Sequence, residues 1–237
     1  VFSMQPTAAE AVAPSVRATI RRQSLPFTPA RMASYLAISK PCGPQLENDY
    51  PIFILDAALQ QAEELSARDD AVEGGAWLIG NLYHQAFPQP EIFGVIHTAL
   101  EVHGAEQKRD SLHLSSTSYY AAQQTLTRRR IHLGREGELV FGLYHTHPFL
   151  PSLLEDRDSC GNCPLVKDCT ATSAFFSQQD AVFHRAAFGL ASYAVQMVRG
   201  LSPRREPDLK MFCFDGGLFR ERGYYKLSRI PSAANFG

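Results

Sequence analysis

Apolar positions along the chain alternate between short, nearly continuous runs and longer stretches with helical spacing. Short runs rich in β-branched and aromatic residues indicate strands, whereas apolar residues three or four positions apart indicate amphipathic helices. The pattern predicts strands over residues 51–54, 71–83, 92–100, 112–114, 139–147, 192–198, 209–214 and 219–227. It predicts helices over residues 55–66, 118–130 and 177–189.

Strands and helices in this mixed order predict one α/β (α+β) domain, with a curved, mixed β-sheet flanked by helices. We place this domain at residues 49–230. An insertion at 149–176 interrupts the periodic pattern with acids, glycine and three cysteines. Residues 1–48 show no sustained period, and we interpret them as an N-terminal extension that wraps the domain or is partly mobile.

Composition narrows the classes of function. Of 237 residues, 45% are hydrophobic and 20% are charged, and the formal net charge is -1. This balance gives no reason to expect a nucleic-acid partner or an anionic membrane surface. No apolar run approaches the roughly 20 residues that a membrane span needs. No signal peptide is visible before Ala30, so we expect a cytoplasmic protein.

The run that begins at Leu139 ends in His145-Thr146-His147-Pro148. Residues two positions apart on a strand point to the same side, so both imidazoles can face one point. Pro148 has no amide hydrogen and should end the strand. The pattern therefore indicates a strand that presents two metal ligands at the edge of the sheet.

Two further segments carry candidate chemistry. Ser177 and Asp180 lie three positions apart, on one face of a predicted helix. This spacing is also that of a capping box, so by itself it indicates no more than the start of a helix. Glu73 precedes Gly74-Gly75 at the start of a buried strand. By itself it is equally compatible with a charge in solvent, but the adjacent glycines permit a close approach of the backbone.

In combination these segments closely resemble the motif of the JAMM (MPN+) zinc metalloproteases. Residues 73–80 (EGGAWLIG) match the glutamate strand of that family, residues 141–148 (FGLYHTHP) match its histidine strand, and Ser177 with Asp180 matches its serine and aspartate. The resemblance covers roughly residues 50–227 and includes the order of the elements. It implies an MPN/JAMM-like fold, which is also cytidine-deaminase-like.

The resemblance also implies roles for these residues. His145, His147 and Asp180 would be the ligands of a catalytic Zn²⁺, with Glu73 as the general base and Ser177 as the hydrogen-bond donor to the oxyanion. The chemistry agrees with this, since two imidazoles and one carboxylate leave an open position, as in catalytic rather than structural zinc sites.

The chain departs from the family between its histidine strand and its serine. Typical members have only a few residues there, whereas this chain has the 28 residues of positions 149–176. Asp156 and Asp158 lie closer to the histidines in sequence and are rival ligands. Neither follows a serine by three positions on a predicted helix, so we favour Asp180.

The insertion contains three cysteines in a C-x2-C-x5-C arrangement, Cys160, Cys163 and Cys169. Such a cluster can hold a second, structural zinc, which needs a fourth ligand. We take Cys213 as the fourth ligand, with His184 and Cys42 as alternatives. An iron–sulfur cluster is the main rival, because thiolates suit both metals, and a disulfide or free thiols are the remaining options. Some deubiquitinating members of the family bind a second zinc in an insertion, which favours zinc.

By resemblance, we expect a deubiquitinase-like hydrolase. It would be a zinc-dependent isopeptidase that removes a ubiquitin-like protein from conjugates or precursors by attack of metal-activated water. The expected partners are that ubiquitin-like protein or its conjugates, and the activating or conjugating enzymes of the same pathway. Two alternatives stay open. One is a JAMM-type peptidase for small peptides or sulfur-carrier adducts, and the other is an inactive MPN scaffold protein.

Overall fold

The longest strands come from the most apolar runs of the sequence. The computed structural model describes residues 19–20, 24–66, 72–108, 112–148, 163–164, 167–189 and 191–231. In it, β8 (Leu139–Thr146), β4 (Gly75–Gln85) and β5 (Glu91–Glu101) are neighbours at the centre of one sheet. The first eight residues of β4 are all buried, because helices cover both faces of the sheet there.

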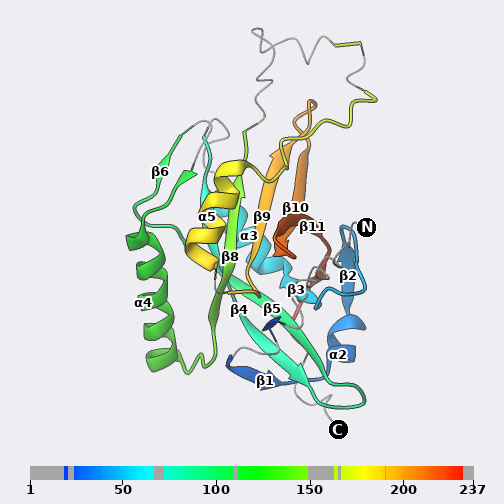
Figure 1. Ribbon diagram of the computed structural model, residues 1–237, viewed down its shortest axis with the longest axis vertical. Helices are drawn as coiled ribbons and strands as arrows, with labels where there is room; N and C mark the ends of the chain where they lie inside the picture. Colours follow the sequence, from blue (N-terminus) through cyan, green and yellow to red (C-terminus); the bar gives the residue numbers. More distant parts are fainter. Residues whose placement is uncertain are drawn as a thin grey trace, which may run out of the picture.

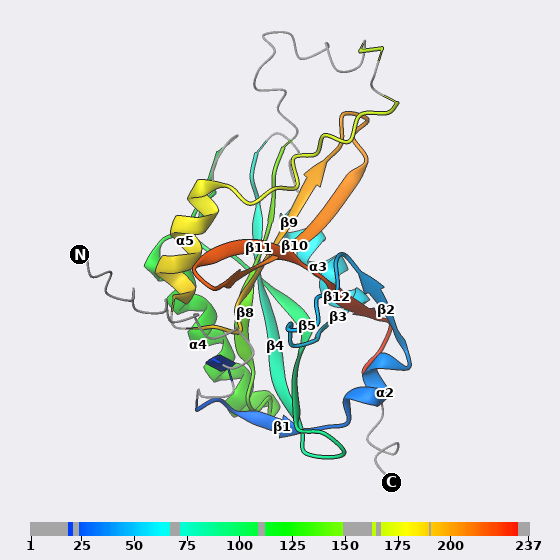
Figure 2. The same cartoon turned by 45° about the vertical axis from the view of Figure 1, so that its right-hand side comes forward.

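The sheet has the order β11-β10-β9-β8-β4-β5-β3-β12-β2, with β1 beside β4. The remaining strands of this sheet are β1 (Phe27–Pro29), β2 (Ser39–Cys42), β3 (Ile52–Leu55), β9 (Val195–Leu201), β10 (Pro207–Asp215), β11 (Leu218–Arg222) and β12 (Tyr224–Leu227). The pairs β1–β4, β3–β5, β3–β12 and β8–β9 are parallel and the others antiparallel. β6 (Glu106–Gln107) and β7 (Leu112–His113) form a separate two-stranded antiparallel sheet. Figures 1 and 2 show that the mixed sheet curls.

Helices pack on both faces of this sheet, as Figures 1 and 2 show. On one face, α3 (Asp56–Ser66) packs with Ala76 and Leu78 of β4. On the other face, α4 (Ser116–Leu133) and α5 (Gln178–Phe188) pack with Trp77 and Ile79. Successive residues of β4 thus enter opposite cores, as the alternation of side chains along a strand requires.

The predicted fold class is confirmed at this level: the structure is α/β (α+β), with a curved, mixed sheet flanked by helices. One strand prediction is wrong, because the run 219–227 forms two strands rather than one. The first, β11, completes the hairpin with β10 around Gly216 and Gly217. The second, β12, leaves that hairpin at Gly223 and pairs in parallel with β3.

The described part of the N-terminal segment contributes to the sheet. After β1, the short helix α2 (Met32–Leu36) buries Tyr35 against Phe53 and Phe93, and β2 then pairs with β12. The strands β1 and β2 therefore join the sheet at separate places, beside β4 and beside β12.

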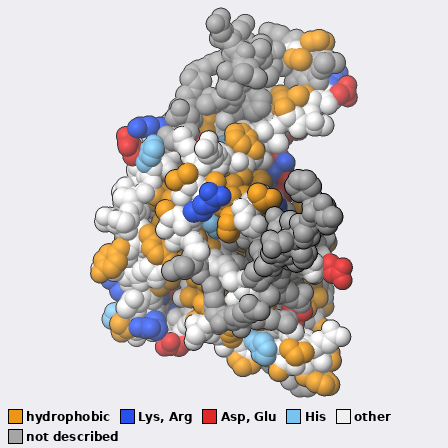
Figure 3. Space-filling view, in the orientation of Figure 1, with side chains coloured by type: hydrophobic (Ala, Val, Ile, Leu, Met, Phe, Trp, Pro, Cys, Tyr) orange, Lys and Arg blue, Asp and Glu red, His pale blue; other side chains and the backbone are white. Residues whose placement is uncertain are grey.

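Two observations bear on membrane and nucleic-acid binding, which the composition gives no reason to expect. Among the described residues, no helix combines the length and apolar character needed to cross a membrane. On the face shown in Figure 3, the described basic and acidic side chains are scattered among neutral and apolar ones. The charges seen there do not gather into a patch of one sign.

Candidate metal centre

The two histidines of the sequence motif lie at the end of β8, between β4 and β9: His145 is within the strand and His147 directly follows it. His145 lies opposite Gly75 on one side and Val198 on the other. The backbone N–H of His147 donates to Arg199 O at 2.8 Å, which holds the chain just beyond the strand. Both side chains are buried, with 1% and 5% of each residue exposed. Their ring centroids lie 4.9 Å apart, so the strand presents both imidazoles to one place.

Asp180 reaches the same place from the first turn of α5. Its Oδ1 lies 3.0 Å from His145 Nε2, and its Oδ2 lies 3.5 Å from His147 Nε2. One ligand atom from each of these three residues lies within 4.8 Å of the other two. Within the described part of the chain, no other group of three or more histidines, cysteines or acids comes together in this way.

The electrostatics keep Asp180 ionised. Burial alone would raise the pKa of this carboxyl group, but His145 and His147 together lower the pKa well below its usual range. The carboxylate is therefore a charged oxygen donor at neutral pH. A negative ligand between two imidazoles is a donor set that binds Zn²⁺.

The hydrogen bonding of the histidines fits a metal. Both ring nitrogens of His145 are buried, and neither makes a hydrogen bond with any residue that the structure describes. The neighbour of His145 Nε2 is Asp180 Oδ1, at 3.0 Å. An unpartnered buried nitrogen is costly unless another group binds it. His147 Nδ1 donates to Ser173 O at 3.0 Å, which leaves its Nε2 for the same centre.

Glu73 stands at the entry to β4, two residues before the strand begins. Its Oε1 lies 3.8 Å from His147 Nε2, and its side chain is 11% exposed. Gly74 makes this approach possible, because a Cβ atom there would lie 1.8 Å from Ser66 O of α3. The backbone N–H of Glu73 donates to Lys108 O at 2.8 Å, and this bond fixes the residue from the other side.

Ser177 is the N-cap of α5 and forms a capping box with Asp180. Its Oγ accepts the N–H of Asp180 at 3.1 Å, and its own N–H donates to Asp180 Oδ2 at 2.8 Å. The sequence pattern therefore serves as a helix cap and brings Asp180 to the histidines at the same time. Because Ser177 Oγ accepts in this pair, its hydroxyl proton remains for another acceptor.

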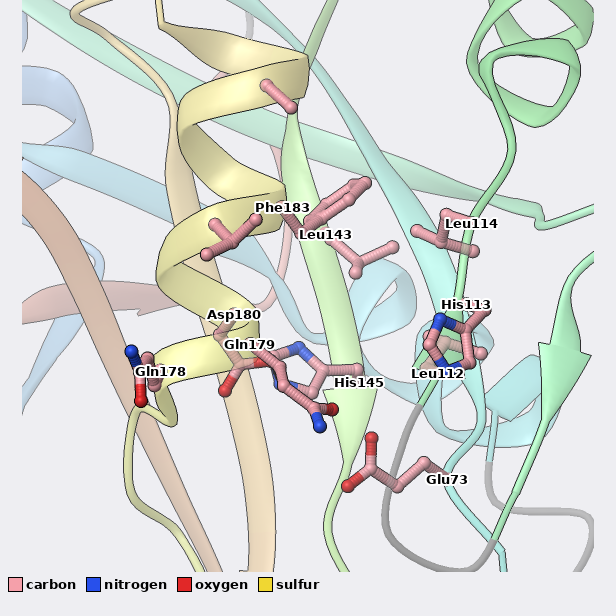
Figure 4. A pocket seen from close by; sticks show the side chains of 12 residues that line it. Glu73, Leu112, His113, Leu114, Leu143, His145, Gln178, Gln179, Asp180 and Phe183 are labelled. Atoms are coloured by element: carbon pink, nitrogen blue, oxygen red, sulfur yellow. Dashed lines mark ion pairs between the residues drawn. The ribbon is translucent and has the colours of Figure 1, made fainter.

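A pocket of about 500 Å³ opens beside His145, Asp180 and Glu73 (Figure 4). It runs between α5 and β7, and Figure 4 shows His145 and Gln179 close to Asp180, with the Glu73 carboxylate below them. Its other walls are mostly apolar and consist of Leu112, His113, Leu114, Leu143, Gln178, Val182, Phe183 and Ala186. The group of possible metal ligands thus borders a space lined mostly by apolar side chains.

The cysteine prediction stays a prediction. Cys160 lies outside the described residues, as do the rival ligands Asp156 and Asp158. Of the others, Cys163 is partly buried, Cys169 is exposed, and Cys213 is buried in the core on β10. His184, an alternative fourth ligand, is buried with its Nδ1 3.2 Å from Gln196 Nε2.

Sequence reasoning missed two residues around the centre. It gave no role to His113, an exposed residue that lines the pocket. It gave Ser173 no role, although Ser173 contacts His147. Nothing in the local sequence signals either contact, because each depends on segments that meet only in the folded chain.

Comparisons with known proteins give no name for this centre. No family model matches the chain, and no curated protein matches it. Among solved structures, the chain is similar to the solution structure of protein DSY2949 from Desulfitobacterium hafniense. The identity is 14%, the match covers 76% of this chain and 94% of that chain, and the TM-score is 0.45.

Proposed function

We propose that this protein is a zinc-dependent isopeptidase of the JAMM type, which removes a ubiquitin-like protein from conjugates or precursors. The observation that carries the proposal is the convergence of His145, His147 and Asp180 within 4.8 Å, with Glu73 next to them. The proposal includes the MPN-type fold, in which a central strand and the following helix supply the ligands.

His145, His147 and Asp180 would hold the metal. When bound there, zinc supplies Lewis acidity, which lowers the pKa of a water molecule and polarises a carbonyl group. Three protein ligands leave a coordination position open for this chemistry.

Glu73 is the general base in this proposal. Its carboxylate accepts a proton from the water that attacks the scissile carbonyl carbon, and a C–O bond forms. As the C–N bond breaks, Glu73 passes that proton to the leaving amine of the lysine. The nearly buried position of its side chain, 11% exposed, keeps this transfer away from bulk solvent.

Ser177 and the pocket support the same reaction. The Ser177 hydroxyl, held at the start of α5 by its bond from Asp180 N–H, donates to the oxyanion that develops on the substrate carbonyl. The apolar walls formed by Leu112, Leu143 and Phe183 hold the substrate residue next to the scissile bond. The partners would be the ubiquitin-like protein, its conjugates and the enzymes that attach it, in the cytoplasm.

The test uses a fluorescent ubiquitin–lysine isopeptide conjugate, and the same conjugate built on other ubiquitin-like proteins. Zinc-loaded protein should cleave at least one of them, and a chelator should abolish the cleavage. Glu73→Gln should retain zinc but lose about 100-fold or more in rate, since a general base contributes roughly that much. The matched control Glu206→Gln removes a carboxylate whose side chain is 60% exposed, and should cleave at the wild-type rate. Cleavage that survives Glu73→Gln or His145→Ala would falsify the proposal.

A second candidate keeps the metal centre and changes the substrate to a small peptide or an adduct on a sulfur-carrier protein. The observation in its favour is the pocket itself, because about 500 Å³ suits a few side chains. Rates on a short isopeptide and on the full conjugate separate the two. Equal kcat/KM values favour the second candidate, whereas a large gain with the full conjugate favours the first.

A further inference from the structure

The chain returns to the sheet at Ser173, where it joins the ends of two strands. Toward β9, the N–H of Ser173 donates to Leu201 O at 3.0 Å, and the N–H of Leu201 donates to Ser173 Oγ at 2.8 Å. Toward β8, Ser173 Oγ donates to His147 O at 2.9 Å. The hydroxyl therefore connects the backbone that follows the histidine strand to the end of its parallel neighbour.

The carbonyl of Ser173 also contacts the imidazole of His147. His147 Nδ1 lies 3.0 Å from Ser173 O. A carbonyl oxygen can only accept, so Nδ1 carries the hydrogen, and in the neutral ring the lone pair is then on Nε2. Nε2 is the atom that faces Asp180 Oδ2 at 3.5 Å. The contact thus selects the tautomer that offers Nε2 to a metal.

The surroundings hold this contact in place. Ser173 is 7% exposed and His147 is 5% exposed, so water has little access to compete for the hydrogen bonds. Gly200 lets the segment lie against β9, because a Cβ atom there would stand 1.9 Å from Ala174 N. On the outer side, the Phe175 ring packs against the His147 ring with centroids 5.1 Å apart.

His145 differs in this respect. Within the described part of the chain, neither of its ring nitrogens has a hydrogen-bond partner. The hydrogen bond to Ser173 O therefore orients the ring of His147, whereas the ring of His145 has Asp180 Oδ1 at 3.0 Å from its Nε2. Outer hydrogen-bond partners of metal-binding histidines fix the tautomer, and their loss typically lowers metal affinity about 10- to 100-fold.

We propose that Ser173 is a positioning residue that holds His147 as an Nε2 ligand of the metal centre. The inference rests on the zinc site of the proposed function and adds to it the residue that orients one ligand. Its hydroxyl fixes the segment between the two strands, and its carbonyl fixes the ring.

The first test is ¹⁵N NMR of the histidine rings in zinc-loaded protein, with the His147 signals assigned from a His147→Gln spectrum. We expect a hydrogen on Nδ1 and zinc on Nε2. Zinc on Nδ1 of His147, or no zinc on this residue, would overturn the proposal in the wild-type protein alone.

The second test is zinc affinity, measured by competition with a chromophoric chelator. Ser173→Ala should bind zinc about 10-fold or more weakly, and Ser173→Thr, which keeps the hydroxyl, should restore the affinity. The control is Ser202→Ala, because Ser202 Oγ accepts the N–H groups of Arg204 and Glu206 in an exposed turn. Equal zinc affinities for Ser173→Ala and Ser202→Ala would show that the Ser173 side chain does not position His147 for the metal. Neither readout uses peptide cleavage, so a protein that passes both tests but cleaves no conjugate contradicts the proposed function and not this inference.

Discussion

Ser177 and Asp180 bind each other reciprocally at the start of α5: the N–H of Ser177 donates to Asp180 Oδ2 at 2.8 Å, and the N–H of Asp180 donates to Ser177 Oγ at 3.1 Å. The same carboxylate lies 3.0 Å from His145 Nε2 and 3.5 Å from His147 Nε2. The helix cap therefore orients the carboxylate that faces the imidazoles. Helix stability and the proposed metal binding therefore depend on the same pair of side chains.

This sharing predicts two separable effects for Ser177→Ala. The lost cap should lower the free energy of unfolding by about 1 kcal/mol. The lost hydroxyl, the proposed donor to the oxyanion, should lower kcat by about 100-fold or more. Urea denaturation and cleavage of the ubiquitin–lysine conjugate measure the two effects.

The chain offers a matched control at α4. Ser115 is the N-cap of that helix, and its Oγ accepts the N–H of Ser118 at 3.3 Å, away from the metal-ligating group. Ser115→Ala should lose similar stability and keep its kcat. A comparable loss of kcat in both variants would assign Ser177 to capping alone.

A second prediction concerns the two glycines after Glu73. Gly74→Ala places a Cβ atom 1.8 Å from the backbone carbonyl of Ser66, so α3 and the Glu73 segment must move apart. We expect a loss of about 1–3 kcal/mol in stability, typical of overpacking, and a displacement of Glu73, the proposed general base. The measurements are urea denaturation and the rate of conjugate cleavage.

Gly75→Ala is the internal control, because the nearest atom to its Cβ would be Leu112 Cδ2 at 2.7 Å. A leucine side chain can rotate away, whereas a helix carbonyl cannot. Gly75→Ala should therefore be the milder substitution for stability, with an effect on KM through the pocket wall. The reverse order of stabilities would contradict this account of the glutamate strand.

Local patterns predicted the elements that carry the centre. The alternation of side chains along a strand placed His145 and His147 on one side, and the i, i+3 spacing placed Ser177 beside Asp180. The glycines after Glu73 indicated a close backbone approach, which Gly74 makes against α3. Each of these features depends on residues that are near one another in sequence.

The features that the sequence did not predict depend on pairing across the fold. The run after Gly217 looked like one strand, but β12 leaves β11 and pairs with β3, about 170 positions earlier in the chain. The contact between Ser173 and His147 uses a backbone carbonyl, which every residue type has. The side chain at position 173 therefore carried no signal of this role.

A third prediction follows from the proposed zinc. Zinc that binds only the folded protein at about 100 times its dissociation constant should add about 2.7 kcal/mol to the free energy of unfolding. His145→Gln should lose this contribution, because it removes a buried nitrogen donor of the group. His113→Gln, a change in the pocket wall outside the group, should keep it.

Thermal denaturation with and without zinc gives the comparison, and the difference between the variants separates this centre from any zinc held by cysteines. Equal zinc-dependent shifts in wild type and His145→Gln would show that the stabilising ion binds elsewhere.

The last prediction concerns pH and a histidine of α5. Burial lowers the pKa of His184 from 6.5 to about 4. Between these values the unfolded chain binds a proton that the folded chain does not, so the folded state loses stability as pH falls from 6.5 toward 4. From pH 7.5 to pH 5 the loss should be about 2 kcal/mol, since one pKa unit corresponds to 1.36 kcal/mol.

Urea denaturation at both pH values, with chelator present so that zinc does not contribute, should show a smaller pH-dependent loss in His184→Gln than in wild type. His132→Gln, which removes an exposed histidine of α4, should follow wild type. If His184→Gln loses as much stability as wild type over this interval, the burial of a neutral His184 is not what makes the fold acid-sensitive.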